Sequence, residues 1–356
     1  MMSSDRDRKV CNSAHSNQSG VALLAVLWLS VALTMIAMTT AYLVRTEAIA
    51  VGNHIESGRA ALLAHAGVEA AVYAILHPAI DPSAPADEPS LNTRIDQQFR
   101  PGQRWLRFDF GTGVADVEVV PENAKLSVNQ APPAQLSALF TNLGLTENQS
   151  QELAAAIVDW RTPRASSVAT PFDFFYVNLP QPYEARHAAM EELDELLAVK
   201  GMSHDLFFGA LSETPEGASR WAPPLADLLT TEPALWGINV MYAPYEVLLV
   251  LPGWDETLAR AVVDARKRIE RGTLAEAVPG LSSAMSLYPV TFTSGAAYTL
   301  TATAEMRDSG VRHSVRARIL LDRTVPLGFR VAGWWEAWPW SNETAAAADR
   351  MGGARI

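Results

Sequence analysis

Side chains able to perform acid–base or metal chemistry are scattered along this chain of 356 residues. None of its seven histidines has another four residues away, and no His-Glu-x-x-His motif occurs. The one cysteine, Cys11, excludes an intrachain disulfide and a cysteine-based metal site. Hydrolase, phosphate-loop and dinucleotide-binding motifs are also absent. Asp159 and Asp264 lie near predicted helix ends, where a structural role is favoured. We therefore predict that the protein is not an enzyme and has no catalytic residues.

One segment, Leu248–Arg266, resembles a helix-hairpin-helix DNA-binding motif. In that motif, a Gly-x-Gly turn presents backbone N–H groups to a phosphate at a helix N-terminus. Here Asp255 replaces the second glycine and Glu256 follows it, so both side chains would repel phosphate. The formal net charge of the chain is -11, which also disfavours phosphate binding. A packing turn between two helices is favoured, and no nucleic-acid partner is expected.

The most distinctive element is an uncharged run of 24 residues, 21–44, which is long enough to cross a membrane as a helix. It is too long for the apolar part of a signal peptide, and no cleavage site of the A-x-A type follows. Apolar residues at helical spacing continue to residue 77, before Pro78. We predict a transmembrane helix over 21–44 and a stem helix over 45–77. Basic residues are in excess before the run, which predicts a cytoplasmic N-terminus.

The start of this helix resembles type IV pilin-like precursors, because a polar, mildly basic leader ends in glycine where the apolar run begins. The resemblance implies that a prepilin peptidase cuts between Gly20 and Val21, which makes 1–20 the leader. Most pilin-like proteins carry Glu at mature position five, whereas this chain has Ala25. A carboxylate in lipid costs roughly 2.5–3.5 kcal/mol unless it is paired. A subunit with no neighbour ahead of it has no use for that charge.

Beyond the stem, polar and apolar residues alternate over 106–110 and 115–119 around a glycine turn, which predicts a β-hairpin. A second hairpin is predicted over 298–321, with a short strand at 290–293 joining the two. Both would pack on the stem helix. The predicted fold is α+β and pilin-like, with sheet segments at 104–120 and 289–322 and a large helical insertion between them.

The insertion contains a weak internal repeat. LSVNQAPPAQL (126–136) parallels INVMYAPYEVL (238–248), and each is followed by a helix that ends in arginine, LAAAIVDWR and LARAVVDAR. A third helical unit covers 195–207. These features resemble the type II secretion minor pseudopilin K (GspK) family, which also lacks the position-five Glu. The resemblance implies SAM-like helical regions at 121–218 and 234–288.

Two further segments bear on ligands and partners. Relatives in this family carry an acidic calcium-binding loop after the DWR motif, but here Asp173 is the only acid between 162 and 176. Calcium needs six to eight oxygen ligands, so we expect no family-type calcium site and no other cofactor. Within 324–356, Trp334, Trp335, Trp338 and Trp340 are clustered, and disorder is expected after residue 340. The cluster is typical either of a partner contact or of a segment folded back over the sheet edge.

The resemblance implies a structural role at the tip of the type II secretion pseudopilus in a Gram-negative inner membrane. The protein would cross the membrane once, with a periplasmic ectodomain, and would support the export of folded proteins. Its implied partners are minor pseudopilins I and J, the pseudopilus below them and prepilin peptidase, together with contact to exported proteins. The alternatives are a minor pilin of a type IV pilus and a membrane-anchored helix-hairpin-helix protein for DNA uptake.

The leader junction gives a direct prediction. Mass spectrometry of the membrane form should find a new N-terminus at Val21, because the polar leader meets the apolar helix there. Substitution of Gly20 by a bulky residue should leave the leader attached, while Ser19→Ala should not. An intact Met1 terminus in the assembled protein would contradict the assignment.

Overall fold

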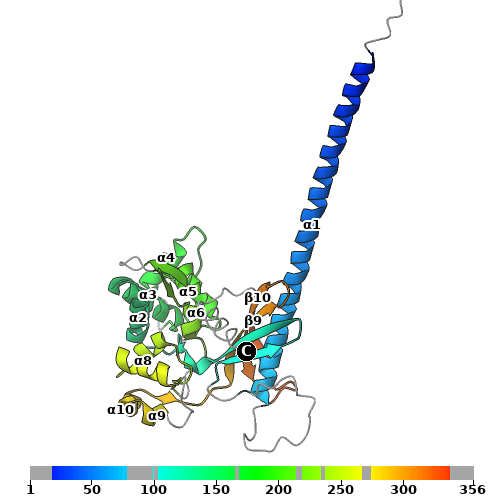
Figure 1. The fold of residues 1–356 in the computed structure, drawn as a ribbon. Helices are drawn as coiled ribbons and strands as arrows, with labels where there is room; N and C mark the ends of the chain where they lie inside the picture. The colour runs from blue at the N-terminus through cyan, green and yellow to red at the C-terminus, as the bar shows by residue number, and fades with distance from the viewer. Residues whose placement is uncertain are drawn as a thin grey trace, which may run out of the picture. The chain divides into compact units, whose positions relative to one another are not determined.

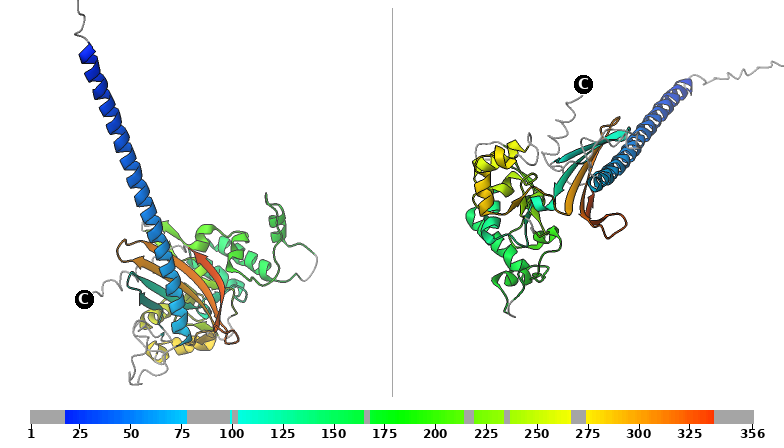
Figure 2. Two further views of the ribbon diagram at one scale, coloured as in Figure 1. Left: turned by 90° about the vertical axis from the view of Figure 1, so that its right-hand side faces the viewer. Right: turned by 90° about the horizontal axis from the view of Figure 1, so that it is seen from below.

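The computed structural model describes residues 18–77, 99, 103–164, 168–213, 219–233, 237–266 and 274–336. The chain divides into two compact units, Met1–Gly58 and Arg59–Ile356. Within the second unit, a five-stranded sheet lies between the end of the long helix and a helical insertion, as the right-hand view of Figure 2 shows. Figure 1 labels most of the helices and the strands β9 and β10.

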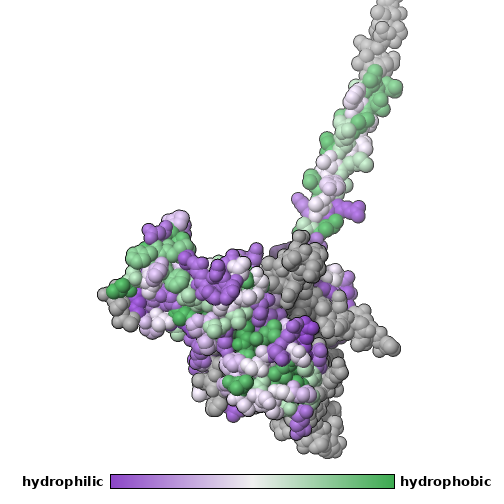
Figure 3. All heavy atoms as spheres, turned by 90° about the vertical axis from the view of Figure 1, so that its left-hand side faces the viewer, coloured by the Kyte–Doolittle hydropathy of each residue, from purple (hydrophilic) through white to green (hydrophobic). Residues whose placement is uncertain are grey.

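Helix α1, Gln18–Leu76, is 59 residues long and includes both the predicted membrane segment and the predicted stem. It is the one helix in the described part of the chain that is long and apolar enough to span a membrane. Its large apolar side chains are exposed along the membrane-length part. Several of them are seen as green spheres on the face of the helix that Figure 3 shows. The hydroxyls of Thr34, Thr40 and Thr46 donate to carbonyls one turn earlier at 2.7–2.8 Å. These bonds satisfy the three hydroxyl donors within the helix.

The sheet is entirely antiparallel and has the order β1-β2-β9-β10-β11. Its strands are β1 Trp105–Asp109, β2 Gly113–Pro121, β9 Ala297–Met306, β10 Arg312–Leu321 and β11 Phe329–Glu336. The two predicted hairpins are present as β1–β2 and β9–β10, and β2 pairs with β9 to join them. The fold is therefore α+β and pilin-like, as predicted.

Alternation along the strands gives the sheet one apolar and one polar face. The apolar face buries small and branched residues, including Ala115, Val117, Ala302 and Ala304, against the end of α1. The helix meets them with its own small residues, and an added Cβ on Gly67 would lie 2.8 Å from the Cβ of Ala115. The helix and the sheet are therefore in close contact at Gly67, where a larger side chain would meet the sheet.

The structure differs from the sequence analysis in two strands. Residues 329–336, placed in the Trp-rich tail, form the fifth strand by pairing with β10. The short strand near residue 290 is β8, Val290–Thr291, and it pairs in parallel with β7, Ile238–Asn239, inside the insertion rather than with the hairpins. Short strands carry little pattern of their own, so their partners are decided by what lies beside them.

The insertion between β2 and β9 is largely helical. Its longer helices are α2 Pro133–Asn142, α3 Glu147–Arg161 and α8 Glu256–Ala265. The shorter helices are η1 Glu122–Ala124, α4 Pro171–Val177, η2 Leu193–Ala198, α5 His204–Phe208, α6 Leu225–Leu228, α7 Tyr245–Leu249, α9 Leu274–Ala277 and α10 Leu281–Leu287. The strands not yet named are β3 Leu126–Ser127 and β6 Leu229–Thr230, a parallel pair, and β4 Ala210–Glu213 and β5 Ser219–Ala222, an antiparallel pair. The insertion has its own apolar core, separate from the helix–sheet core.

The two repeats of the insertion are closed by equivalent arginines. Arg161, at the end of α3, donates to the carbonyls of Val128 and Ala131. Arg266, which follows α8, donates to the carbonyls of Val240 and Ala243. These valines and alanines occupy matching places in the two repeated segments. The same side chain thus joins the last helix of each repeat to its first segment.

The contact at Gly67 gives a test of the helix–sheet packing. Gly67→Val should lower the free energy of unfolding by about 1–3 kcal/mol, because the sheet opposite cannot move aside freely. Gly58→Val is the matched control, since nothing lies within 4 Å of a Cβ there. Chemical unfolding of the solubilised full chain should show a loss only for Gly67→Val. Equal stabilities would mean that the helix does not pack closely at this position.

Candidate functional site

The predicted assembly residues lie near the start of α1. Gly20 falls in its first turn, Val21 follows, and Ala25 lies one turn further and is exposed. The helix is continuous across the predicted cleavage point. Residues 21–44 offer no carboxylate at any position. Cleavage at this junction stays a prediction.

The predicted calcium-loop residue, Asp173, is buried in a polar cluster at the start of α4. One of its oxygens lies 2.8 Å from the ring nitrogen Nε2 of His187 and 2.8 Å from Nη2 of Arg164. Its other oxygen accepts the backbone N–H of Thr170 at 2.7 Å, and the Thr170 hydroxyl donates to Asp159 at 3.1 Å. The cluster therefore joins α3, α4 and the loop that contains His187.

Burial by itself raises the pKa of Asp173, but the Thr170 N–H, His187 and Arg164 outweigh it, and the pKa is held well below its usual range. The native state therefore favours the ionised carboxylate. The stability that this carboxylate contributes is present above the ordinary Asp pKa and is lost as the pH falls through the lowered value. At neutral pH the cluster keeps its charge.

The same cluster offers three groups that could hold a metal ion. Single ligand atoms of Asp159, Asp173 and His187 all lie within 4.8 Å of one another. One imidazole and two carboxylates make a poor calcium site, because calcium needs six to eight oxygens. In addition, Arg164 already provides a positive charge at Asp173. The residues do not fit the family's calcium chemistry. The sequence analysis identified Asp173 but could not predict that Asp159 and His187 lie beside it.

His187 is also the one described non-glycine residue with a positive φ, at 48°. This conformation is unfavourable for a residue with a Cβ and persists where surrounding contacts hold it. The bond from Nε2 to Asp173 supplies such a contact. The loop geometry at His187 therefore depends on the carboxylate.

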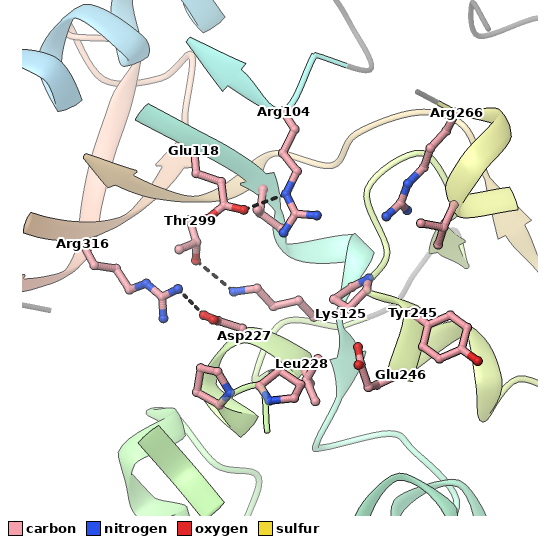
Figure 4. A pocket seen from close by; sticks show the side chains of 15 residues that line it. Arg104, Glu118, Lys125, Asp227, Leu228, Tyr245, Glu246, Arg266, Thr299 and Arg316 are labelled. Atoms are coloured by element: carbon pink, nitrogen blue, oxygen red, sulfur yellow. Dashed lines mark hydrogen bonds and ion pairs between the residues drawn. The ribbon is translucent and has the colours of Figure 1, made fainter. Parts of the chain in front are cut away.

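The polar face of the sheet is joined to the insertion by ion pairs. Arg316 on β10 binds Asp227 of α6, and Arg318 binds Glu192 at 3.2 Å. Between the sheet and the insertion lies a cavity of about 270 Å³, shown in Figure 4. Arg104, Lys125, Arg266 and Arg316 reach its wall together with three acidic side chains and three prolines. Sequence spacing gave no signal for this cavity, because its walls come from segments that lie far apart in the chain, between Arg104 and Arg316.

Two of the four clustered tryptophans, Trp334 and Trp335, lie in strand β11. Trp334 packs edge-on against the ring of His65 on α1, with 4.7 Å between ring centroids. Trp335 points to the other face, where it lines a small cavity beside Arg316 and packs on the core of the insertion. Trp338 and Trp340 lie outside the described residues. Trp334 and Trp335 thus belong to the edge strand of the sheet.

A carboxylate–histidine group that sequence analysis missed closes this edge. Glu336, at the end of β11, lies 2.8 Å from Nε2 of His65 and 3.4 Å from Nε2 of His313. Burial raises the pKa of Glu336, and the bonds from Trp334 and both histidines outweigh it and lower the pKa. These contacts fasten the last strand to both α1 and β10.

The segment that resembles a DNA-binding hairpin is a packing turn. Asp255 is the N-cap of α8, and its carboxylate accepts the Leu258 N–H at 2.7 Å. The helix N-terminus that would bind a phosphate therefore already has an anionic partner.

The long apolar helix, the antiparallel sheet and the inserted helical domain define an α+β, pilin-like fold. Residues 115–209 match the family model described as "Type II secretion system (T2SS), protein K". This match lies over β2 and the first repeat, so this part of the chain is similar to the type II secretion system protein K family that the sequence resembles.

Two further comparisons complete the picture. A solved structure, "The Crystal Structure of the GspK-GspI-GspJ complex from enterotoxigenic Escherichia coli Type 2 Secretion System", contains a chain similar to this one at 16% identity and a TM-score of 0.44. The likeness covers 67% of this chain and 84% of that chain. No curated protein matches the chain.

The Asp173 cluster predicts how the melting temperature responds to calcium. Millimolar calcium should raise the melting temperature by less than about 2 °C, because Arg164 and His187 already contact the carboxylate. A Kd about 100-fold below the calcium concentration would stabilise by roughly 2.7 kcal/mol, which is a readily measured shift.

Asp173→Asn is the matched control for this measurement. It should lower the melting temperature with or without calcium, since it removes the charge that Arg164 and His187 face. A clear rise in the wild type that EDTA reverses and that Asp173→Asn abolishes would show a calcium site at the cluster.

Proposed function

We propose that this chain is the tip subunit of a type II secretion pseudopilus and has no catalytic activity. The observation that carries the proposal is Ala25, which leaves the apolar part of α1 without a carboxylate. In a helical stack, each subunit below the tip can pair such a carboxylate with the terminal amine of its neighbour. The topmost subunit has no such amine, so an unpaired Glu there would only add a cost of roughly 2.5–3.5 kcal/mol.

The size of the insertion supports the same placement. It occupies the chain between β2 and β9 and has a core of its own, so it is a separate body added to the pilin-like helix and sheet. A body of this size is difficult to repeat along a closely packed fibre. At the end of the fibre it meets no subunit above, and there it would stop further growth.

The proposed setting follows from the N-terminal apolar helix, which fits a single-pass inner-membrane anchor. The basic residues of the leader favour a cytoplasmic N-terminus, and the remaining chain would be periplasmic. Prepilin peptidase would remove residues 1–20. The protein K in the solved complex assembles with GspI and GspJ. We expect corresponding partners here, contact with exported proteins, and none with nucleic acid.

The tip role predicts both a stoichiometry and a location. The ectodomain should form a soluble 1:1:1 complex with the ectodomains of its I and J partners and should not form filaments by itself. Size-exclusion chromatography with light scattering measures the first, and gold labelling of assembled pseudopili measures the second. Label along the shaft, instead of at one end, would falsify the tip placement.

Ala25→Glu tests the residue that carries the proposal. The added carboxylate should reduce secretion by impairing membrane insertion or initiation, since no terminal amine lies ahead of it. Ala25→Gln is nearly the same size without the charge and should retain most activity. If the two variants behave alike, the missing charge at mature position five does not explain a tip position for this chain.

A further inference from the structure

We propose that the Trp338-Pro339-Trp340 segment binds in the cavity between the sheet and the insertion and joins these two parts of the same chain. The cavity is the one of about 270 Å³ shown in Figure 4. This is several times the roughly 30 Å³ share of one water, so it can take an aromatic ring system. The segment itself lies outside the described residues.

The lining of the cavity fits an indole ring. Arg104, Arg266 and Arg316 bring three guanidinium groups to its wall, and Lys125 brings an ammonium. Cations of this kind are attracted to the face of a tryptophan more than to any other aromatic side chain. Pro223, Pro224 and Pro244 add flat apolar surface, and the Tyr245 ring stands at the same wall. An indole would meet cationic and apolar groups together.

The position of the last described strand brings this segment within reach. Trp335 stands opposite Arg316 in the β10–β11 register, and Arg316 lines the cavity. The sheet residues of the cavity lie on β10, β9 and β2, which are one to three strand spacings from β11, or roughly 5–15 Å. Three to five residues beyond Trp335 span roughly 10–17 Å when extended. Trp338 and Trp340 fall within that range.

Trp335 already makes the kind of contact that is proposed for the residues after it. It lines a second, smaller cavity that shares Lys125, Thr299 and Arg316 with the large one. It also packs against the core of the insertion from its place in the sheet. The chain therefore leaves β11 beside a junction at which one tryptophan is bound. This favours the chain's own tail over a separate partner as the occupant.

Disulfide trapping in the full chain tests the proposal. With Cys11→Ser the chain has no cysteine, so two introduced cysteines can pair only with each other. Ser341→Cys follows the segment and leaves both tryptophans in place, and Glu246→Cys is at the cavity wall. A disulfide forms only when the two Cα atoms come within about 7 Å. We expect an intramolecular bond, identified by mass spectrometry of the non-reduced digest.

Two controls separate docking from chance encounter. Ser341→Cys with Ala138→Cys, an exposed site on α2 that is not part of the cavity lining, should give about tenfold less bond. Trp338→Ala with Trp340→Ala, added to the first pair, should lower its yield by a similar factor. Thermal unfolding of each variant confirms that the fold is retained.

Three outcomes of the trapping experiment would overturn the proposal. Equal yields at Glu246→Cys and Ala138→Cys would mean that the tail moves freely. A yield unaffected by the loss of both tryptophans would mean that they do not bind. A bond formed only between molecules would assign the cavity to a second copy. As an independent check, a peptide of residues 337–342 should bind the Trp338→Ala, Trp340→Ala chain and not the wild type, whose cavity is filled; absence of binding to the double variant would also contradict the proposal.

Discussion

A buried ion pair connects the five-stranded sheet to the helical insertion. Glu122 and Lys125, in the turn after β2, lie 2.6 Å apart with almost no exposure. Glu122 also accepts hydrogen bonds from Thr299 on β9 and Thr230 on β6. Burial raises the pKa of Glu122, but Lys125 and the two hydroxyls outweigh it and lower the pKa. Removing one partner of such a pair leaves an uncompensated buried charge, which costs about 3–5 kcal/mol. The sheet and the insertion therefore hold each other at this point.

The arrangement around this pair follows from the two faces of the sheet. The apolar face meets α1 through small residues, so the helix fits closely, and the contact of His65 with Glu336 adds a polar link at the sheet edge. The polar face carries Thr299, Thr301, Arg316 and Arg318, which are buried by the insertion and are paired with it or with each other. The same sheet thus packs on α1 through its apolar face and binds the insertion through ion pairs and hydrogen bonds on its polar face.

The insertion is organised for rigidity rather than for chemistry. Arg161 and Arg266 each close one repeat through backbone carbonyls, and Arg164 and His187 hold the Asp173 loop through a carboxylate. Each of these side chains fixes a backbone segment. Such contacts suit the structural role that we propose for this chain.

The sequence by itself determined the long helix, both hairpins, the repeat and the missing carboxylate at Ala25. These features depend on local spacing, which a single chain displays directly. The pairing of β8 with β7, the fifth strand β11, the meeting of His187 with Asp159 and Asp173, and the cavity were decided only by the tertiary structure. Each of them joins residues from separate elements, and a strand of two residues or a lone histidine has no periodicity to reveal its partner. Long-range packing, not local preference, placed them.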